Sequence, residues 1–315
     1  MVRAFVFPGQ GSQILGMGKD LYENSSTAKE VFDLIDDSLN QKLTKIMFEG
    51  PSEDLLLTQN TQPAIMAVSL ALIKVLEKDY NFDIIKNVNF MAGHSLGEYS
   101  ALCALKVLPI DITAKILKIR GEAMMSASPY GVGSMAAILG INDISKVQQL
   151  IDDTKLESEI CVIANDNSLG QVVISGHSKS IDKAIEQAKE YGASKAIKLS
   201  VSGPFHSPLM EKASQKLAEE LNEINFNKPF CPLISNVLAK PVLDINEIKI
   251  LLVQQVVSGV RWRESMDYLI SQNLSEIVEV GNGVVLNGLM KRINPNIKRV
   301  NLQSLADIQS YVSTL

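Results

Sequence analysis

A serine between two glycines, in a turn that joins a strand to a helix, constrains this chain more than any other feature. The segment Gly93-His94-Ser95-Leu96-Gly97 follows an apolar stretch at residues 88–92 and precedes a helix-compatible stretch at residues 98–106. This is the nucleophile-elbow pattern in its required context. So tight a turn leaves no room for side chains at the glycines and strains the serine backbone. The pattern predicts an exposed hydroxyl beside the Leu96 N–H and a helix N-terminus, both suited to an oxyanion.

Composition and charge exclude two classes of function. The chain has 315 residues, of which 46% are hydrophobic and 21% are charged, as in an ordinary globular protein. Its net charge of −5 argues against a nucleic-acid partner, because nucleic-acid binders are normally basic. No apolar run reaches the roughly 18 residues of a membrane span, so we expect no membrane partner.

The N-terminus and the cysteines indicate the compartment. The apolar residues 4–7 meet Pro8 and Gly9 too early to form a signal peptide. Cys103, Cys161 and Cys231 are too widely spaced to suggest a disulfide framework or a metal site. We therefore expect a cytoplasmic protein without a bound metal.

The first part of the chain has the pattern of a large α/β domain. Strands are expected at residues 3–7 and 88–92, and helices within residues 18–48, 62–78 and 112–127. This alternation is typical of a mainly parallel sheet that is covered by helices. Together with the elbow, it predicts an α/β-hydrolase-like fold.

A strong break at residues 129–133 introduces a different pattern. The expected strands and helices then follow in the order βαββαβ, the ferredoxin-like signature. The strands are expected at residues 134–139, 159–164, 171–175 and 196–201, and the helices at 144–151 and 180–191. We expect a large domain of residues 1–130 and 202–315, with a small ferredoxin-like α+β domain of residues 131–201 inserted in it.

The serine needs a base, and the chain contains three histidines. His94 adjoins Ser95, and neighbours around a tight turn usually point apart, so we interpret it as a structural or oxyanion-shaping residue. His177 lies in a turn of the inserted domain and is interpreted as a surface residue. His206 lies in a loop that two prolines and a glycine make rigid, so by elimination it is the best partner for Ser95.

Arg120 is the second unusual residue. It falls within the apolar arc of the helix expected at residues 112–127. An arginine turned toward a core must meet an anion or extend to solvent. A structural salt bridge and a clamp for a substrate carboxylate both explain this position, and the pattern leaves the two open.

The glycine-rich turn at residues 8–13 follows the first strand. It lacks the third glycine of a dinucleotide-binding loop and the Gly-Lys-Ser/Thr of a phosphate loop. A backbone N–H in this turn is instead a candidate for a second oxyanion donor.

Seven short motifs, in a consistent order along the whole chain, point to one family. They are Phe-Pro-Gly-Gln-Gly-Ser-Gln at residues 7–13, Thr-Gln-Pro-Ala at 61–64, Gly-His-Ser-Leu-Gly-Glu-Tyr at 93–99, Arg-Gly at 120–121, Gly-Gln-Val-Val-Ile-Ser-Gly at 170–176, Pro-Phe-His at 204–206 and Glu-Val-Gly at 279–281. With these motifs the chain resembles the malonyl-CoA:acyl-carrier-protein transacylases, the freestanding acyltransferases of bacterial fatty-acid synthesis.

The resemblance implies roles for the residues around the serine. Ser95 would be the acylated nucleophile and His206 its base. Gln255 would orient His206 through its backbone carbonyl, in place of a triad carboxylate. The backbone N–H groups of Gln10 and Leu96 would form the oxyanion hole.

It also implies a substrate, a partner and a selectivity. Arg120 would hold the malonyl carboxylate, and Phe205 would crowd an α-methyl branch. The implied substrates are malonyl-CoA and the phosphopantetheine thiol of an acyl carrier protein, with no cofactor. The oligomeric state is left open, with a monomer as the working expectation.

Two other functions share some of these features. A serine esterase or thioesterase would use the same elbow, with an acid in chain order between Ser95 and His206, where the chain has many. A non-catalytic acyl-binding protein is the second alternative.

An acidic carrier protein would also need a basic patch on this acidic chain. The candidates are residues 179–198, Arg261 with Arg263, and Lys291 with Arg292.

Overall fold

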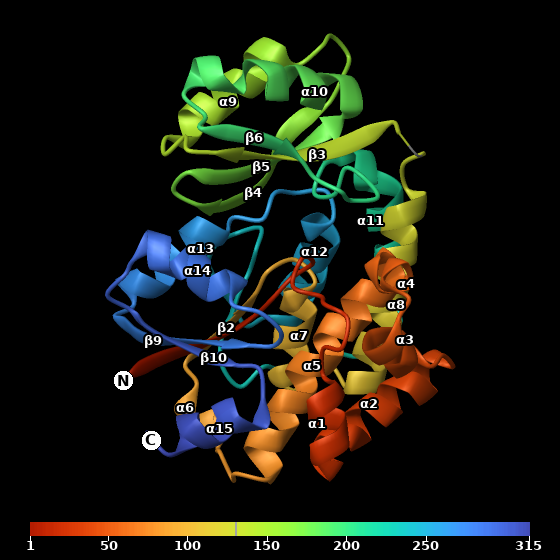
Figure 1. Ribbon diagram of the computed structural model, residues 1–315, viewed down its shortest axis with the longest axis vertical. Coiled ribbons are helices and arrows are strands. Elements are labelled where there is room, and N and C mark those ends of the chain that lie inside the picture. The colour runs from red at the N-terminus through yellow and green to blue at the C-terminus, as the bar shows by residue number, and fades with distance from the viewer. Residues whose placement is uncertain (130) are drawn as a thin grey trace.

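A computed structural model describes residues 1–129 and 131–315 and contains two sheets with their helices (Figure 1). The larger sheet has six strands in the order β10-β9-β1-β2-β7-β8. Neighbouring strands are parallel except for β7 and β8. The strands are β1 (Val2–Phe7), β2 (Phe90–Gly93), β7 (Leu233–Ile234), β8 (Pro241–Val242), β9 (Leu274–Val280) and β10 (Lys298–Leu302). This confirms the predicted mainly parallel α/β sheet.

Helices cover both faces of the larger sheet because its strands are apolar on both sides. In β1, Phe5 and Phe7 belong to one buried cluster, and Ala4 and Val6 belong to the other. The first cluster is covered by α1 (Lys19–Asn24), α2 (Ser26–Leu39), α3 (Leu43–Glu49), α4 (Ser52–Leu56), α5 (Thr58–Lys78), α6 (Ile84–Asn87), α7 (Gly97–Ala104), α8 (Ile110–Ser126), α11 (Glu211–Asn222), α12 (Ile245–Gln255) and α15 (Leu305–Val312). The second is covered by α13 (Trp262–Ser271) and α14 (Val285–Ile293).

The smaller sheet is antiparallel, with the strand order β4-β5-β3-β6. Its two helices pack on one face, and Figure 1 shows them at the top, on the side away from the larger sheet. The elements are β3 (Gly133–Leu139), α9 (Ile144–Thr154), β4 (Cys161–Ser168), β5 (Gln171–His177), α10 (Ser178–Gln187) with a 3₁₀ turn (Ala188–Tyr191), and β6 (Lys195–Lys198). The predicted βαββαβ order is confirmed. The division into domains at residues 130 and 202 stays a prediction, and residue 130 lies outside the described residues.

Several predicted elements differ in their ends, and strand β4, for example, runs over Cys161–Ser168 instead of residues 159–164. Helix α5 begins at Thr58, one turn before the predicted start, and Pro63 lies inside it. Strand β6 ends at Lys198 instead of Val201: the Leu199 N–H still bonds to the Met135 carbonyl of β3, and residues 199–202 then line a cavity.

Among the described residues, no helix has both the length and the apolar character that crossing a membrane requires.

The turn between β2 and α7 brings two backbones into direct contact. A Cβ on Gly93 would lie 1.9 Å from the carbonyl carbon of Gly97, and a Cβ on Gly97 would lie 2.2 Å from the Phe7 carbonyl oxygen. Ser95, between the glycines, has a φ of 54°, in the left-handed region that side-chain-bearing residues rarely adopt. These features are those of the predicted elbow.

Replacing Gly93 tests this contact. We expect Gly93→Ala to lower the free energy of unfolding by about 3 kcal/mol or more, since backbone atoms must move to admit the methyl group. Gly288→Ala is the matched control, because a Cβ there meets nothing within 4 Å on helix α14. It should be neutral or stabilising by about 0.5–1 kcal/mol. Urea unfolding measures both, and equal effects would contradict the expectation.

Candidate active site

Ser95 and His206, 111 residues apart in sequence, meet at the carboxyl end of β2. The Ser95 Oγ atom lies 2.8 Å from His206 Nε2. His206 lies in the loop between β6 and α11, with a φ of 56°, and only 4% of its surface is exposed. The loop therefore holds the imidazole rigidly against the hydroxyl, as expected for a nucleophile and its base.

The backbone carbonyl of Gln255 sets the orientation of the His206 ring. His206 Nδ1 lies 2.8 Å from the Gln255 carbonyl oxygen, at the end of α12. A carbonyl only accepts hydrogen bonds, so Nδ1 carries the proton and Nε2 presents its lone pair to Ser95. Burial, with a smaller contribution from the Arg120 cation, lowers the pKa of His206 to about 3. The imidazole is therefore neutral, which is the form that can accept the serine proton.

Arg120 is buried beside the nucleophile, and its hydrogen-bond partners are neutral groups. Its Nη1 donates to the Gln62 side-chain oxygen at 2.7 Å, and its Nη2 donates to Gln255 Oε1 at 2.9 Å and to Ser95 Oγ at 3.1 Å. Its guanidinium carbon also lies 5.6 Å from the centre of the Tyr99 ring. Within the described residues, none of its hydrogen bonds goes to a carboxylate. The nearest carboxyl group, Glu98, reaches Arg120 only through the Gln255 side chain. A buried cation without a hydrogen-bonded anion is costly, which favours the clamp over the structural salt bridge.

The two candidate oxyanion donors lie at the same end of the sheet. Gln10 follows β1 and Leu96 precedes α7, and both line the cavity that contains Ser95. Among the described residues, neither backbone N–H has a hydrogen-bond partner. Two free donors beside a nucleophile are what an oxyanion hole requires.

The cavity beside Ser95 has a volume of about 400 Å³. Phe205 is buried in its wall next to the base. The smaller sheet contributes Met135 and Asn165, and residues 199–202 complete that side. The structure thus brings the predicted residues Ser95, His206, Gln255, Gln10, Leu96, Arg120 and Phe205 together at one cavity or directly behind it.

The other two histidines lie outside the proton path. His94 is half-buried, and its Nε2 lies 2.8 Å from Asn167 Oδ1. His177 accepts the Ile160 backbone N–H at 2.8 Å through Nδ1, within the smaller sheet. The contact between His94 and Asn167 agrees with the interpretation of His94 as a structural residue. His177 is partly buried, and its hydrogen bond shows that it also ties two segments of the inserted part together.

Three residues of the site were not assigned a role from the sequence. Gln62 accepts from Arg120, Asn236 accepts the Ser95 backbone N–H at 2.8 Å, and Glu98 contacts the Gln255 side chain. The positions of Gln62 and Glu98 within quoted motifs were the available signals, and nothing in the sequence marked Asn236. Neither signal says which distant residue the side chain meets.

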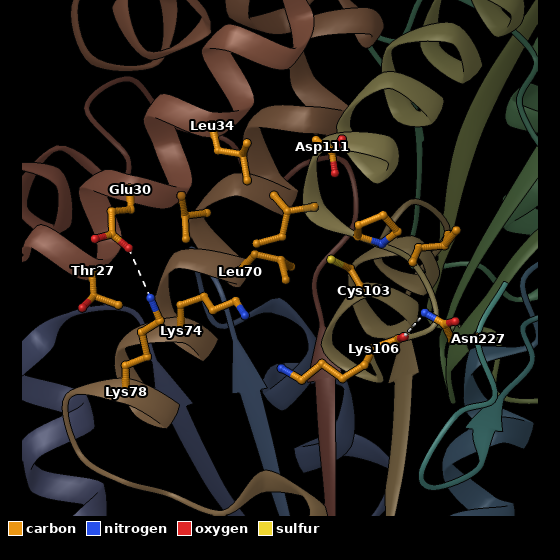
Figure 2. Close-up of a pocket in the computed structure, with 14 residues that line it drawn as sticks. Thr27, Glu30, Leu34, Leu70, Lys74, Lys78, Cys103, Lys106, Asp111 and Asn227 are labelled. Carbon is orange, nitrogen blue, oxygen red and sulfur yellow. Dashed lines mark hydrogen bonds and ion pairs between the residues drawn. The ribbon is translucent and has the colours of Figure 1, made fainter. Parts of the chain in front are cut away.

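A second cavity, of about 460 Å³, lies among α2, α5, α7 and α8 (Figure 2). Figure 2 shows Lys74, Lys78 and Lys106 around it, together with Cys103. Lys78 pairs with Glu30 at 3.2 Å, and Lys106 also pairs with an acid. None of the predicted site residues lines this cavity, so the candidate chemistry lies at Ser95. The described residues also contain no group of three or more potential metal ligands.

Comparison with known proteins first defines the class. The profile of the acyl transferase domain matches residues 4–290, a range that contains every residue assigned to the site. A serine with a neutral histidine base and free oxyanion donors is the apparatus that acyl transfer requires. The fold and the site are those of an acyl transferase.

Full-length relatives then identify the family. The malonyl CoA-acyl carrier protein transacylase of Bacillus subtilis is 44% identical over 312 residues, which cover 99% of this chain and 96% of that protein. The crystal structure of an acyl-carrier-protein-S-malonyltransferase from Bartonella henselae has a TM-score of 0.97 at 46% identity, covering 100% and 99% of the two chains. A malonyl-transacylase in complex with a type II polyketide acyl-carrier protein has a TM-score of 0.95 at 34% identity, covering 100% of both. The chain belongs to the malonyl CoA-acyl carrier protein transacylase family.

The low pKa of His206 predicts how Ser95 reactivity depends on pH. Because His206 stays neutral down to about pH 4, labelling of Ser95 by an organofluorophosphate should change by less than about twofold between about pH 5 and 7. A histidine with an ordinary pKa of about 6.5 would slow labelling more than about tenfold over this range. Intact-mass spectrometry after timed quenching measures the rate, and an inflection near pH 6.5 would refute the expectation.

Proposed function

We propose that this chain transfers a malonyl group from malonyl-CoA to the phosphopantetheine thiol of an acyl carrier protein, through a malonyl ester on Ser95. The observation that carries this proposal is Arg120, a buried cation without a carboxylate partner that points at the Ser95 hydroxyl. Such a cation suits a substrate that brings its own carboxylate. Family membership and the neutral base support the same reaction.

The first half of the reaction acylates the serine. The Ser95 Oγ atom attacks the thioester carbonyl carbon while His206 Nε2 takes its proton. The backbone N–H groups of Gln10 and Leu96 stabilise the oxyanion that forms. The carbon–sulfur bond then breaks, and the leaving coenzyme A sulfur takes the proton from His206.

The second half reverses these steps with a different thiol. The thiol of the carrier protein gives its proton to His206 and attacks the Ser95 ester. The ester bond breaks, and Ser95 regains its proton. Because His206 carries every proton in the scheme, we propose that the reaction requires no cofactor.

The cavity wall supports a preference for malonyl over branched acyl groups. Phe205 lies beside His206 and is buried, so an α-methyl group on the acyl chain would press against its ring. Packing discrimination against one methyl group is worth about 1–3 kcal/mol, so the preference should be measurable but incomplete.

The partner of His206 favours a transferase over a serine esterase or thioesterase. Such hydrolases usually place a carboxylate behind the base. Here the partner of Nδ1 is the Gln255 carbonyl oxygen. We also propose that the enzyme acts in the cytoplasm, which agrees with its three free, buried cysteines.

Charge pairing narrows the proposed docking surface for the carrier protein. Arg261 pairs with Glu264, and Arg263 pairs with Asp166. These pairs reduce the positive charge available to an acidic partner. Lys198 likewise pairs with Asp182. The other lysines of residues 179–198 and the pair at residues 291–292 are therefore the favoured candidates.

The first test of the proposed function is detection of the covalent intermediate. Incubation of the protein with malonyl-CoA alone should add one malonyl group to the intact mass, and the adduct should disappear when carrier protein is added. Ser95→Ala should show no adduct. Steady release of free malonate without an adduct would indicate a hydrolase. If neither an adduct nor free malonate appears, the protein is an acyl-binding protein.

The second test asks whether Arg120 binds the malonyl carboxylate. Arg120→Ala should lower malonyl transfer about 10²-fold or more while acetyl transfer changes much less, because only malonyl loses an ion pair. Lys115→Ala, which removes an exposed cation from the same helix, should leave both rates unchanged. Steady-state assays with the two acyl-CoA donors give the ratio. Equal losses for both donors in Arg120→Ala would refute the carboxylate clamp.

A further inference from the structure

Glu98 is a buried carboxyl group that the reaction scheme does not use. It lies in the first turn of α7, three residues after Ser95, and only 1% of its surface is exposed. Its Oε2 atom accepts a hydrogen bond from the Gln255 side-chain nitrogen, and its Oε1 atom accepts the Asn236 backbone N–H at 3.4 Å. Burying a carboxyl group is costly, so contacts of this kind point to a specific role.

The Gln255 side chain connects Glu98 to the reacting groups. Its nitrogen also donates to the Ser95 backbone carbonyl at 3.0 Å, and its oxygen accepts from Arg120 Nη2 at 2.9 Å. The nitrogen of an amide only donates, and the oxygen only accepts. Because Glu98 is an acceptor, the nitrogen must face Glu98 and the oxygen must face Arg120.

Asn236 connects Glu98 to the turn that carries the nucleophile. Its side-chain oxygen accepts the Ser95 backbone N–H at 2.8 Å, and its side-chain nitrogen donates to the Gly93 carbonyl at 2.7 Å. Both residues that contact Glu98 therefore hold the backbone of the elbow. Gln255 in addition holds the His206 ring through its own carbonyl.

We propose that Glu98 is a positioning residue for acyl transfer. By accepting hydrogen bonds from Gln255 and Asn236, it fixes the direction of the Gln255 amide, and hence of the Arg120 guanidinium, relative to Ser95. Loss of the acceptor leaves the amide held by the Ser95 carbonyl and Arg120 alone, so the Gln255 side chain and the Arg120 guanidinium are held less firmly against Ser95. The inference rests on the proposed function, because the expected effect of Glu98 is on the rate of Ser95 acylation.

The groups that face Glu98 give this role a pH signature. Burial raises the pKa of Glu98 to about 8, although the nearby Arg120 cation favours the ionised form. Burial raises the pKa of Tyr99 above its usual range, and it lowers the pKa values of His94 and His206. None of these three groups titrates near pH 8. Below this pH the Glu98 carboxyl group carries a proton, which faces the N–H donors of Gln255 and Asn236. Above it both carboxylate oxygens accept hydrogen bonds from these donors. Acylation of Ser95 should therefore accelerate as the pH rises.

The experiment compares the wild type with Glu98→Gln and with Glu279→Gln as the matched control. Glu279 is fully buried and accepts the backbone N–H groups of Leu286 and Asn287 at 3.0 and 2.8 Å, but it does not line the cavity of Ser95. Each protein is mixed with excess malonyl-CoA and quenched at timed intervals. Intact mass gives the single-turnover rate of Ser95 malonylation from about pH 6 to about pH 9.5.

We expect the wild-type rate to rise several-fold through about pH 8. Glu98→Gln should be at least about tenfold slower at about pH 9 and should lack this rise, since misplacement of reacting groups is costly and glutamine does not titrate. Glu279→Gln should keep the wild-type rate and profile. Thermal unfolding of all three proteins verifies that they are folded.

Two results would overturn the inference. One is a wild-type rate and profile in Glu98→Gln, and the other is an equal loss in both variants. If Glu98→Gln does not fold, the wild type alone decides, because a constant rate from about pH 7 to about pH 9 contradicts a titrating Glu98. Absence of any adduct in the wild type would instead overturn the proposed function, and this inference with it.

Discussion

The pairing of β1 with β2 is the constraint on which the rest of the site depends. The register sets Phe7 opposite Gly93, and Gly97 approaches the Phe7 carbonyl so closely that no side chain fits between them. Gln10 and Leu96 each lie three residues beyond the paired position. Since parallel strands end at the same edge of a sheet, the loops that follow them meet there, and two N–H donors converge without a dedicated binding element.

Around this edge the protein uses neutral dipoles where many serine enzymes use charges. A carboxylate beside Arg120 would satisfy the guanidinium but also cancel its charge, whereas the amide oxygens of Gln62 and Gln255 satisfy N–H groups and leave the charge available. A carbonyl behind His206 likewise orients the ring without stabilising the imidazolium as a carboxylate would. Neutral partners thus keep the base uncharged and the cation unpaired within the same small volume.

The parts of the site that the sequence predicts are those that local spacing encodes. The elbow occupies five consecutive residues, and Arg120 stands out because the helical period places it among apolar neighbours. The βαββαβ order of the inserted part follows from short, regular segments in the same way. Gln255 was assigned through the family resemblance alone, because nothing near it in sequence marks it.

The contacts of Glu98 could not be predicted, for a physical reason. Its partners Asn236 and Gln255 lie 138 and 157 residues further along the chain. A glutamate in the first turn of a helix is ordinarily a favourable solvent-exposed residue, since it complements the helix dipole. Only tertiary packing shows that this one is enclosed.

The cavity wall belongs to two parts of the chain that fold around different sheets. Met135, Asn165 and residues 199–202 come from the smaller sheet or its exit, whereas the nucleophile, the base and the cation come from the larger part. Selection can therefore reshape the acyl pocket through the inserted segment while the reacting groups stay unchanged. The proposed malonyl preference, by contrast, depends on Arg120 and Phe205 in the larger part, so changes in the inserted segment alter the rest of the pocket wall and leave that preference in place.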